Sequence, residues 1–194
     1  MKPLLTLIIS LSFFITNAQQ PSKAKFDSLL TRAKINFSMP DSCSELNIKF
    51  MHKIPHHFAV GPKDSSFQIR YWVRPLDTWF KNYNKKSKKQ KKKSMHPDAL
   101  CKSMMMLAVL DASGNKSRNY QTSQDQELTK LAYNANWDAS TIVESGWPNE
   151  GYKLCYIYCL HKDGVGDIFF YALANKKEDF LKISGLIGKS IKFQ

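Results

Sequence analysis

The chain has 194 residues and a formal net charge of +13 at pH 7. Its eight glycines and eight prolines are too few for a fibrous or low-complexity protein, and its length fits one domain of ordinary size. No apolar stretch after the first eighteen residues is long enough for a transmembrane helix, so we expect a mature chain without a transmembrane segment.

The first eighteen residues have the layout of a secretory signal peptide. Lys2 provides a positive start, an apolar stretch runs from Leu4 to Ile15, and small or polar residues lead to Ala18. About twelve apolar residues are too few to span a bilayer, which needs about 20. We therefore expect cleavage after Ala18 and export to the periplasm or the cell exterior.

The N-terminal part of the mature chain predicts one helix followed by extended segments. Ser22 is a suitable cap for a helix whose apolar residues recur at helical spacing from Phe26 to Ala33. Alternation of apolar and polar residues predicts extended segments at 35–39, 46–50, 58–60 and 67–73.

The basicity of the chain is concentrated in one segment. Residues 81–96 contain eight lysines, and the rest of the chain carries a net charge of only +5. Such a composition cannot build a packed core, and its like charges repel one another. We therefore expect a basic, solvated and mobile loop at about 81–96.

The C-terminal part contains the strongest signals. Residues 152–161 and 167–173 are rich in strand formers and flank the turn sequence Lys162-Asp163-Gly164, which predicts a hairpin. Both runs are apolar at odd and even positions, so we expect central strands that are covered on two faces. The other predicted elements are helices from Pro97, from the Ser123/Gln126 capping pattern and from Phe180 to a stop at Gly188, and a final strand at 191–193.

The order of these elements predicts the fold class. No internal repeat and no second domain boundary is visible in the sequence. Hairpins mixed with helices are typical of α+β proteins, in which helices pack on a mostly antiparallel sheet. We therefore predict a single α+β domain over residues 19–194.

The four cysteines are Cys43, Cys101, Cys155 and Cys159. An even number in an exported chain favours disulfides. Cys155 and Cys159 lie about 13 Å apart along one predicted strand, which is too far for them to pair with each other. Two alternatives stay open: Cys43 and Cys101 each pair with one of these two, or the cysteines are small buried thiols.

The residues with metal-binding side chains do not show a metal-site spacing. Cys155, Cys159 and His161 share one strand face, but the separation of the sulfurs prevents both from reaching one ion. His52, His56 and His57 cluster upstream, and His56 and His57 lie beside Pro55 in a predicted loop, where we expect them to be exposed. In the run Met104–Met106, only Met104 falls on the apolar stripe of the predicted helix, so we interpret these methionines as core rather than copper ligands. We predict no metal and no cofactor.

No nucleophile-elbow, zinc-protease or phosphate-loop motif is present. Asp138, His161 and Asp163 lie near the best-formed strands, and a hydrolase-type site built from these three residues is one hypothesis. His161 ends a strand at a turn, where a surface position is the simplest interpretation.

The second hypothesis is a non-enzymatic binding or assembly module. The basic segment would then bind an acidic protein or an anionic polymer or surface, with Trp79 and Phe80 contributing to the contact. Nucleic acid is disfavoured because only Tyr83 is interleaved for base stacking and because the chain is expected to be exported. The predicted binding residues are Trp79, Phe80, Lys85, Lys86, Lys88, Lys89, Lys91, Lys92 and Lys93.

The order of the motifs resembles that of PsbP-like proteins, which are α/β/α sandwiches found among small exported binding or assembly proteins. The resemblance is carried by the opening helix, by Phe37-Ser38-Met39-Pro40, by the late hairpin and by the final helix leading to Ser190-Ile191-Lys192-Phe193. The segments Trp137-Asp138-Ala139, His161-Lys162-Asp163 and Phe169-Phe170-Tyr171 are also similar to small uncharacterised exported bacterial proteins. Neither resemblance implies catalytic residues.

Overall fold

The computed structural model describes residues 22–48, 56–147 and 151–194. The predicted signal peptide, His52 and the end of the strand predicted at 46–50 lie outside these ranges. Within the described ranges, none of the helices has the length and apolarity that crossing a membrane requires.

The centre of the fold is a seven-stranded antiparallel sheet. A second, two-stranded sheet pairs β1 (Ile35–Phe37) with β9 (Ile191–Phe193). The strands of the large sheet, in spatial order, are β2 (Ser44–Glu45), β3 (Phe58–Gly61), β4 (Phe67–Pro75), β8 (Gly166–Ala174), β7 (Leu154–Lys162), β6 (Trp137–Glu144) and β5 (Gln121–Thr122).

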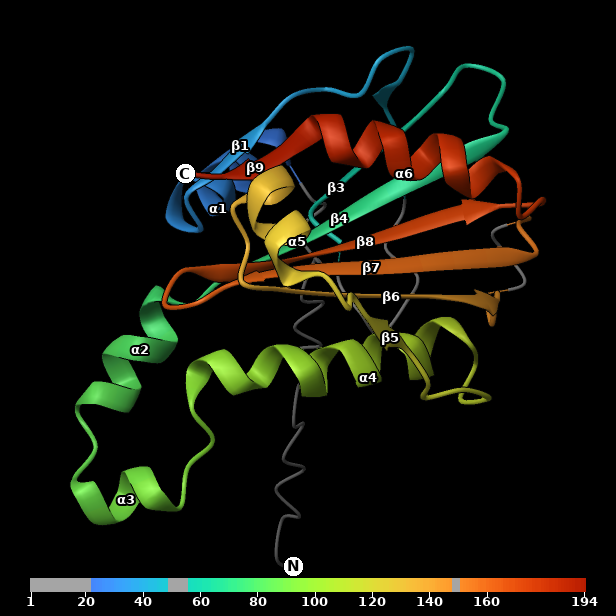
Figure 1. The fold of residues 1–194 in the computed structure, drawn as a ribbon. Coiled ribbons are helices and arrows are strands. Elements are labelled where there is room, and N and C mark those ends of the chain that lie inside the picture. Colours follow the sequence, from blue (N-terminus) through green and yellow to red (C-terminus); the bar gives the residue numbers. More distant parts are fainter. Residues whose placement is uncertain (1–21, 49–55, 148–150) are drawn as a thin grey trace, which may run out of the picture.

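Helices cover both faces of this sheet, which gives three layers (Figure 1). On one face lie α1 (Lys23–Arg32), α5 (Gln126–Tyr133) and α6 (Asp179–Ser190), and on the other lies α4 (Leu100–Ala112). Each face has its own apolar core: Phe26 and Ile183 belong to the first, and Met105 and Val109 to the second. The predicted α+β class, with helices packed on an antiparallel sheet, is confirmed.

The predicted hairpin is confirmed as β7 and β8, and both strands are central. Every residue of β8 is buried, because α6 and α4 exclude water from its two faces. The strands are joined by a turn in which Gly164 has a φ of +71°, a left-handed conformation that glycine adopts without steric cost. Apolar residues at both odd and even positions are therefore explained by burial on two sides.

Several predicted boundaries differ from the structure. The strand predicted at 46–50 is wrong over its described part, because residues 46–48 are not in a strand and β2 ends just before them, at Glu45. Helix α5 is capped by Asp125, whose carboxylate accepts from the Leu128 amide at 3.0 Å, whereas Ser123 supports Asp125 itself. The last helix passes through Gly188 and ends at Ser190, because Ile191 turns directly into the extended backbone of β9.

The prediction that Met104 lies on the buried stripe of its helix is wrong. Met105 is fully buried and lies with Ala108, Val109 and Ala112 against the sheet, whereas Met104 is only partly buried. The helix is apolar on nearly all sides, so its sequence defines no single stripe. Leu107, in the same helix, is 46% exposed.

The prediction of a loop at 81–96 is also wrong. Helix α2 (Asp77–Asn84) and helix α3 (Lys88–Lys92) form most of this segment, and the short helix η1 (Pro97–Ala99) follows. Neither α2 nor α3 contains a buried residue, and both lie away from the sheet (Figure 1). We call residues 77–96 the basic arm.

Phe170→Ala tests the importance of the double-sided core. Phe170 is fully buried on β8 and packs against Tyr71 and Tyr158, at ring-centroid distances of 5.5 and 5.8 Å. We expect a loss of about 3–5 kcal/mol in the free energy of unfolding, measured by urea denaturation, because the truncation leaves a cavity. Leu181→Ala, at a position that is 84% exposed, is the control and should cost less than about 0.5 kcal/mol.

Candidate functional site

The basic arm is fastened to the body of the protein at its first residue. The guanidinium of Arg32, at the end of α1, donates two hydrogen bonds to the carboxylate of Asp77, at 2.9 and 2.7 Å. This hydrogen-bonded pair lowers the pKa of Asp77 to about 2. Both side chains are about half exposed, so the pair positions the arm more than it stabilises the fold.

A small aromatic cluster connects the last residue of the arm with helix α2. The ring of His96 packs edge-on against Phe80 and Tyr83, at centroid distances of 5.5 and 5.0 Å. The ammonium of Lys91 lies 5.2 Å from the centre of the Tyr83 ring, within cation–π range. Phe80 was predicted to bind a partner. Its side chain is partly exposed, but it also packs inside the arm against His96.

A capping box explains why the lysine-rich segment is helical. The Ser87 hydroxyl accepts from the Gln90 amide at 3.4 Å, and the Gln90 side chain accepts from the Ser87 amide at 2.9 Å. These bonds satisfy two backbone donors at the start of α3. The Ser-x-x-Gln pattern is present in the sequence, but the prediction of a loop rested on the lysine composition and did not use it.

The arm also encloses a groove of about 320 Å³. Its lining includes Trp79, Tyr83, Lys86 and Met95 of the arm and Leu100 at the start of α4. Trp79 is 52% exposed and Met95 is 55% exposed, so apolar surface is presented beside the charges. The lysines predicted to bind are exposed, apart from Lys91, which is partly covered.

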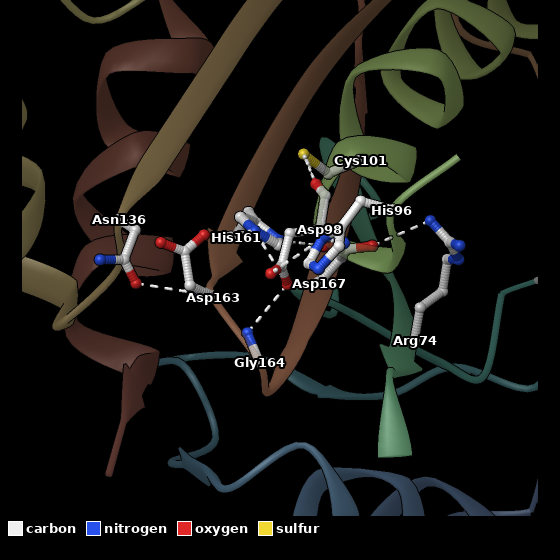
Figure 2. Close-up of polar contacts among 9 residues, drawn as sticks. All are labelled: Arg74, His96, Asp98, Cys101, Asn136, His161, Asp163, Gly164 and Asp167. Atoms are coloured by element: carbon white, nitrogen blue, oxygen red, sulfur yellow. Dashed lines mark hydrogen bonds and ion pairs between the residues drawn. The ribbon is translucent and has the colours of Figure 1, made fainter. Parts of the chain in front are cut away.

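A second group of polar residues surrounds His161, at the end of β7 (Figure 2). Arg74, Asp167 and His161 form one row across β4, β8 and β7, because each is in register with the next. The Nδ1 atom of His161 lies 2.6 Å from Asp167 Oδ1, and Arg74 donates to Asp167 Oδ2 at 2.9 Å. Asp167 is fully buried, and the side chain of Arg74 is only 10% exposed.

The other nitrogen of His161 faces two further carboxylates. Its Nε2 atom lies 3.0 Å from Asp163 Oδ1, in the hairpin turn, and 3.7 Å from Asp98 Oδ1, in η1. Asp98 is held in place because its Oδ1 accepts from the Gly164 amide at 2.8 Å. We call Asp98, His161, Asp163 and Asp167 the histidine cluster.

The carboxylates determine the protonation of His161. Burial lowers its pKa, but the hydrogen bond and charge of Asp167, together with those of Asp163, raise it by more, so the net shift is upward. An imidazolium in this position donates one N–H to each of the two carboxylates. The prediction of a surface histidine is wrong, since the side chain is 3% exposed.

The structure does not bring together all three residues of the hydrolase hypothesis. His161 and Asp163 are neighbours, but Asp138 lies on the opposite face of the sheet. The carboxylate of Asp138 accepts from Thr129 at 2.9 Å and from Tyr158 at 3.3 Å, over the core formed with α1, α5 and α6. The register explains this result, because Trp137, rather than Asp138, is opposite His161.

All four cysteines are free thiols. Cys155 and Cys159 belong to the core beneath α4, whereas Cys43 packs against the core on the other face, so a bond from Cys43 to either would have to cross the sheet. The thiol of Cys101 donates to the Asp98 carbonyl at 3.1 Å. Burial, and then the charge of Asp167, raise its pKa to about 12, so Cys101 is not an activated nucleophile.

Two groups in the described part of the chain have the composition of a metal site. The first contains Cys101, His161 and Asp167, and the second contains Asp98, His161 and Asp163. In each group the candidate ligand atoms lie within 4.8 Å of one another. Sequence reasoning missed Asp98, Asp167 and Arg74, because their proximity depends on strand register and on the return of the chain after the basic arm.

Comparisons with known proteins add no family assignment. A scan against models of protein families, a search of curated proteins and a search of solved structures each found no match. The resemblance to PsbP-like proteins therefore stays a prediction, carried by the order of motifs alone.

Asp167→Asn tests the buried row of charges. Loss of this carboxylate leaves Arg74 and His161 without their shared counter-charge, so we expect a loss of about 3–5 kcal/mol in the free energy of unfolding, measured by urea denaturation. Asp138→Asn is the matched control. Its partners are neutral hydroxyls, so about 1 kcal/mol should be lost there. Equal losses in the two variants would contradict the assignment of a special role to Asp167.

Asp77→Asn tests the anchor at the start of the arm. The pKa of Asp77 falls from 3.8 to about 2 on folding, so its stabilisation is complete above pH 3.8 and is lost as the pH falls through about 2. Because the pair is half exposed, we expect the variant to lose less than about 1 kcal/mol at neutral pH. The difference from the wild type should shrink as the pH falls through about 2 and vanish below it, and a difference that persists there would contradict this origin.

Proposed function

We propose that the protein is an exported, non-enzymatic binding or assembly module that docks an acidic protein partner on its basic arm. The observation that carries this proposal is the arm itself, a helical projection that lies away from the sheet (Figure 1). It presents exposed lysines together with a groove that Trp79, Met95 and Lys86 help to line. The layout of residues 1–18 supports export, and the order of motifs shared with PsbP-like proteins supports a binding or assembly role.

The charge of the arm is available to a partner. Asp77 is the only acidic residue in the sequence of the arm, and it is already bound to Arg32. The exposed lysines are compact point charges on long side chains, which attract an acidic surface and accelerate encounter without imposing one fixed geometry. Charge alone, however, would serve a polymer or a lipid surface equally well.

The groove favours a protein over a bare polyanion. Trp79 and Met95 are both more than half exposed and flank the groove beside Lys86. Tryptophan and methionine are enriched at protein interfaces, where an apolar side chain of the partner fills such a groove while charges surround it. A polyanion would use the lysines and leave these apolar side chains without a role.

The order of the arm also favours specific docking. The capping box at Ser87, the bond from Lys86 to Ser94 at 2.8 Å and the packing of His96 hold the lysines on a defined scaffold. A preordered surface loses less conformational entropy on binding than a mobile loop does. The lysines of the arm are therefore held in a defined arrangement before a partner binds.

Photo-cross-linking from the groove tests this proposal. A photoreactive residue replaces Met95, and cross-linked proteins are identified by mass spectrometry in the cells that produce the protein. We expect an acidic protein, with an adduct that decreases at least about tenfold in Trp79→Ala and in a variant carrying Lys88→Gln, Lys89→Gln, Lys92→Gln and Lys93→Gln. The adduct should also weaken steeply as salt rises.

Four exposed lysines elsewhere provide the charge-matched control: Lys63, Lys130, Lys176 and Lys177, each changed to Gln. This control should retain the adduct. An adduct that survives both arm variants would overturn the proposal. Binding to phosphatidylglycerol vesicles or polyphosphate that requires the arm lysines but is unchanged in Trp79→Ala, with no acidic protein captured, would replace it with an anionic surface or polymer.

A further inference from the structure

The Nε2 side of His161 is a meeting point for three separate parts of the chain. Asp98 comes from η1, His161 from the end of β7 and Asp163 from the hairpin turn (Figure 2). One atom from each of these side chains lies within 4.8 Å of the other two. Two carboxylates and one imidazole are a donor set typical of transition-metal ions.

We infer that Asp98, His161 and Asp163 bind one divalent transition-metal ion, best matched by zinc, through Nε2 of His161 and one oxygen of each carboxylate. The inference concerns a different surface from the proposed docking of a partner on the basic arm, and it does not depend on that docking. It departs from the sequence-based expectation of no metal, which considered His161 with Cys155 and Cys159, the histidines at 52, 56 and 57, and the methionines at 104–106, but did not combine His161 with Asp98 and Asp163.

The orientation of His161 is already that of a metal ligand. Its Nδ1 atom lies 2.6 Å from Asp167, and Arg74 binds the second oxygen of the same carboxylate. A metal-bound histidine usually donates its other ring N–H to a carboxylate, which fixes the tautomer and directs the free nitrogen toward the ion. Asp167 is therefore the positioning residue, and Arg74 holds it in place.

The balance of charge also fits a divalent ion. The histidine cluster contains three carboxylates, and Arg74 compensates one of them. With a neutral His161, two negative charges are left, and an ion of charge +2 neutralises them. A proton on His161 compensates only one, so the ion is the better counter-charge for this partly buried group.

The distances require only small adjustments. Ligand atoms about 2.1 Å from a tetrahedral zinc ion lie about 3.4 Å from one another. The separations from Nε2 are 3.0 Å to Asp163 and 3.7 Å to Asp98, on either side of this value. The side chain of Asp163 is 63% exposed, so it can rotate, and it gives the ion and a fourth ligand from solvent access to the site.

The alternative set with Cys101 fits less well. Cys101, His161 and Asp167 are all buried, and Asp167 is already shared between His161 and Arg74. The thiol of Cys101 donates to the Asp98 carbonyl, and its burial disfavours the thiolate that a metal requires. The two sets differ in their sulfur ligand, so spectroscopy separates them.

The test titrates chelator-treated protein with Co²⁺, followed by optical absorption, and then with Zn²⁺, followed by calorimetry and thermal unfolding. We expect one equivalent to bind with micromolar or tighter affinity, an increase in melting temperature, and a cobalt spectrum without a thiolate charge-transfer band. Asp163→Asn should weaken binding at least about tenfold while it retains the fold, because this side chain is largely exposed.

The matched control is Asp64→Asn, which changes an exposed aspartate in another turn. It should bind zinc like the wild type. No saturable binding of either ion, or equal affinity in Asp163→Asn and wild type, would overturn the inference and leave the histidine cluster as a hydrogen-bond network. A thiolate band that disappears in Cys101→Ser would also overturn it, in favour of the buried set.

Discussion

The fold is organised around one buried carboxylate. Asp167 is fully buried at the start of a central strand, where an uncompensated charge would be very costly. Arg74 and His161 supply its hydrogen bonds from the two neighbouring strands. This requirement fixes the register of three strands at once, because a shift by one residue would turn Asp167 into an apolar core. The chain returns to this row after the basic arm, where Asp98 of η1 lies beside His161.

The distribution of charge follows from this arrangement. Inside the domain, the buried charge of Asp167 is compensated by Arg74 and His161 in one row across three strands. The lysines of 81–96 cannot be matched in this way, and the chain carries them on helices that lie outside the two cores. Their mutual repulsion is reduced by solvation and by screening, which a position in the interior would remove. The basic segment is therefore compatible with a stable domain because it is kept apart from it.

Sequence reasoning succeeded where one local pattern determined the outcome. The hairpin was predictable because an Asp-Gly turn joined two runs that were apolar at odd and even positions. It failed where composition alone was used, as at Ser87 and Gln90, whose capping box starts a helix within the lysine-rich segment. It also failed where proximity depends on register: Asp138 and Trp137 are adjacent in sequence, yet only Trp137 lies opposite His161. Asp98 approaches His161 through a tertiary contact that no local spacing encodes.

The two ends of the basic arm are held by interactions of different kinds. At the start, Arg32 and Asp77 are both about half exposed, so salt screens their attraction and solvent competes for their hydrogen bonds. Where the chain returns to the domain after the arm, Pro97 is buried and Asp98 accepts a hydrogen bond from the Gly164 amide. Salt screens charges less in this partly buried region beside the histidine cluster. The attachment after the arm is therefore the less exposed of the two. Asp98 belongs both to the histidine cluster and to η1, the short helix that directly follows the arm, so the same side chain takes part in the buried row's surroundings and in the attachment of the arm.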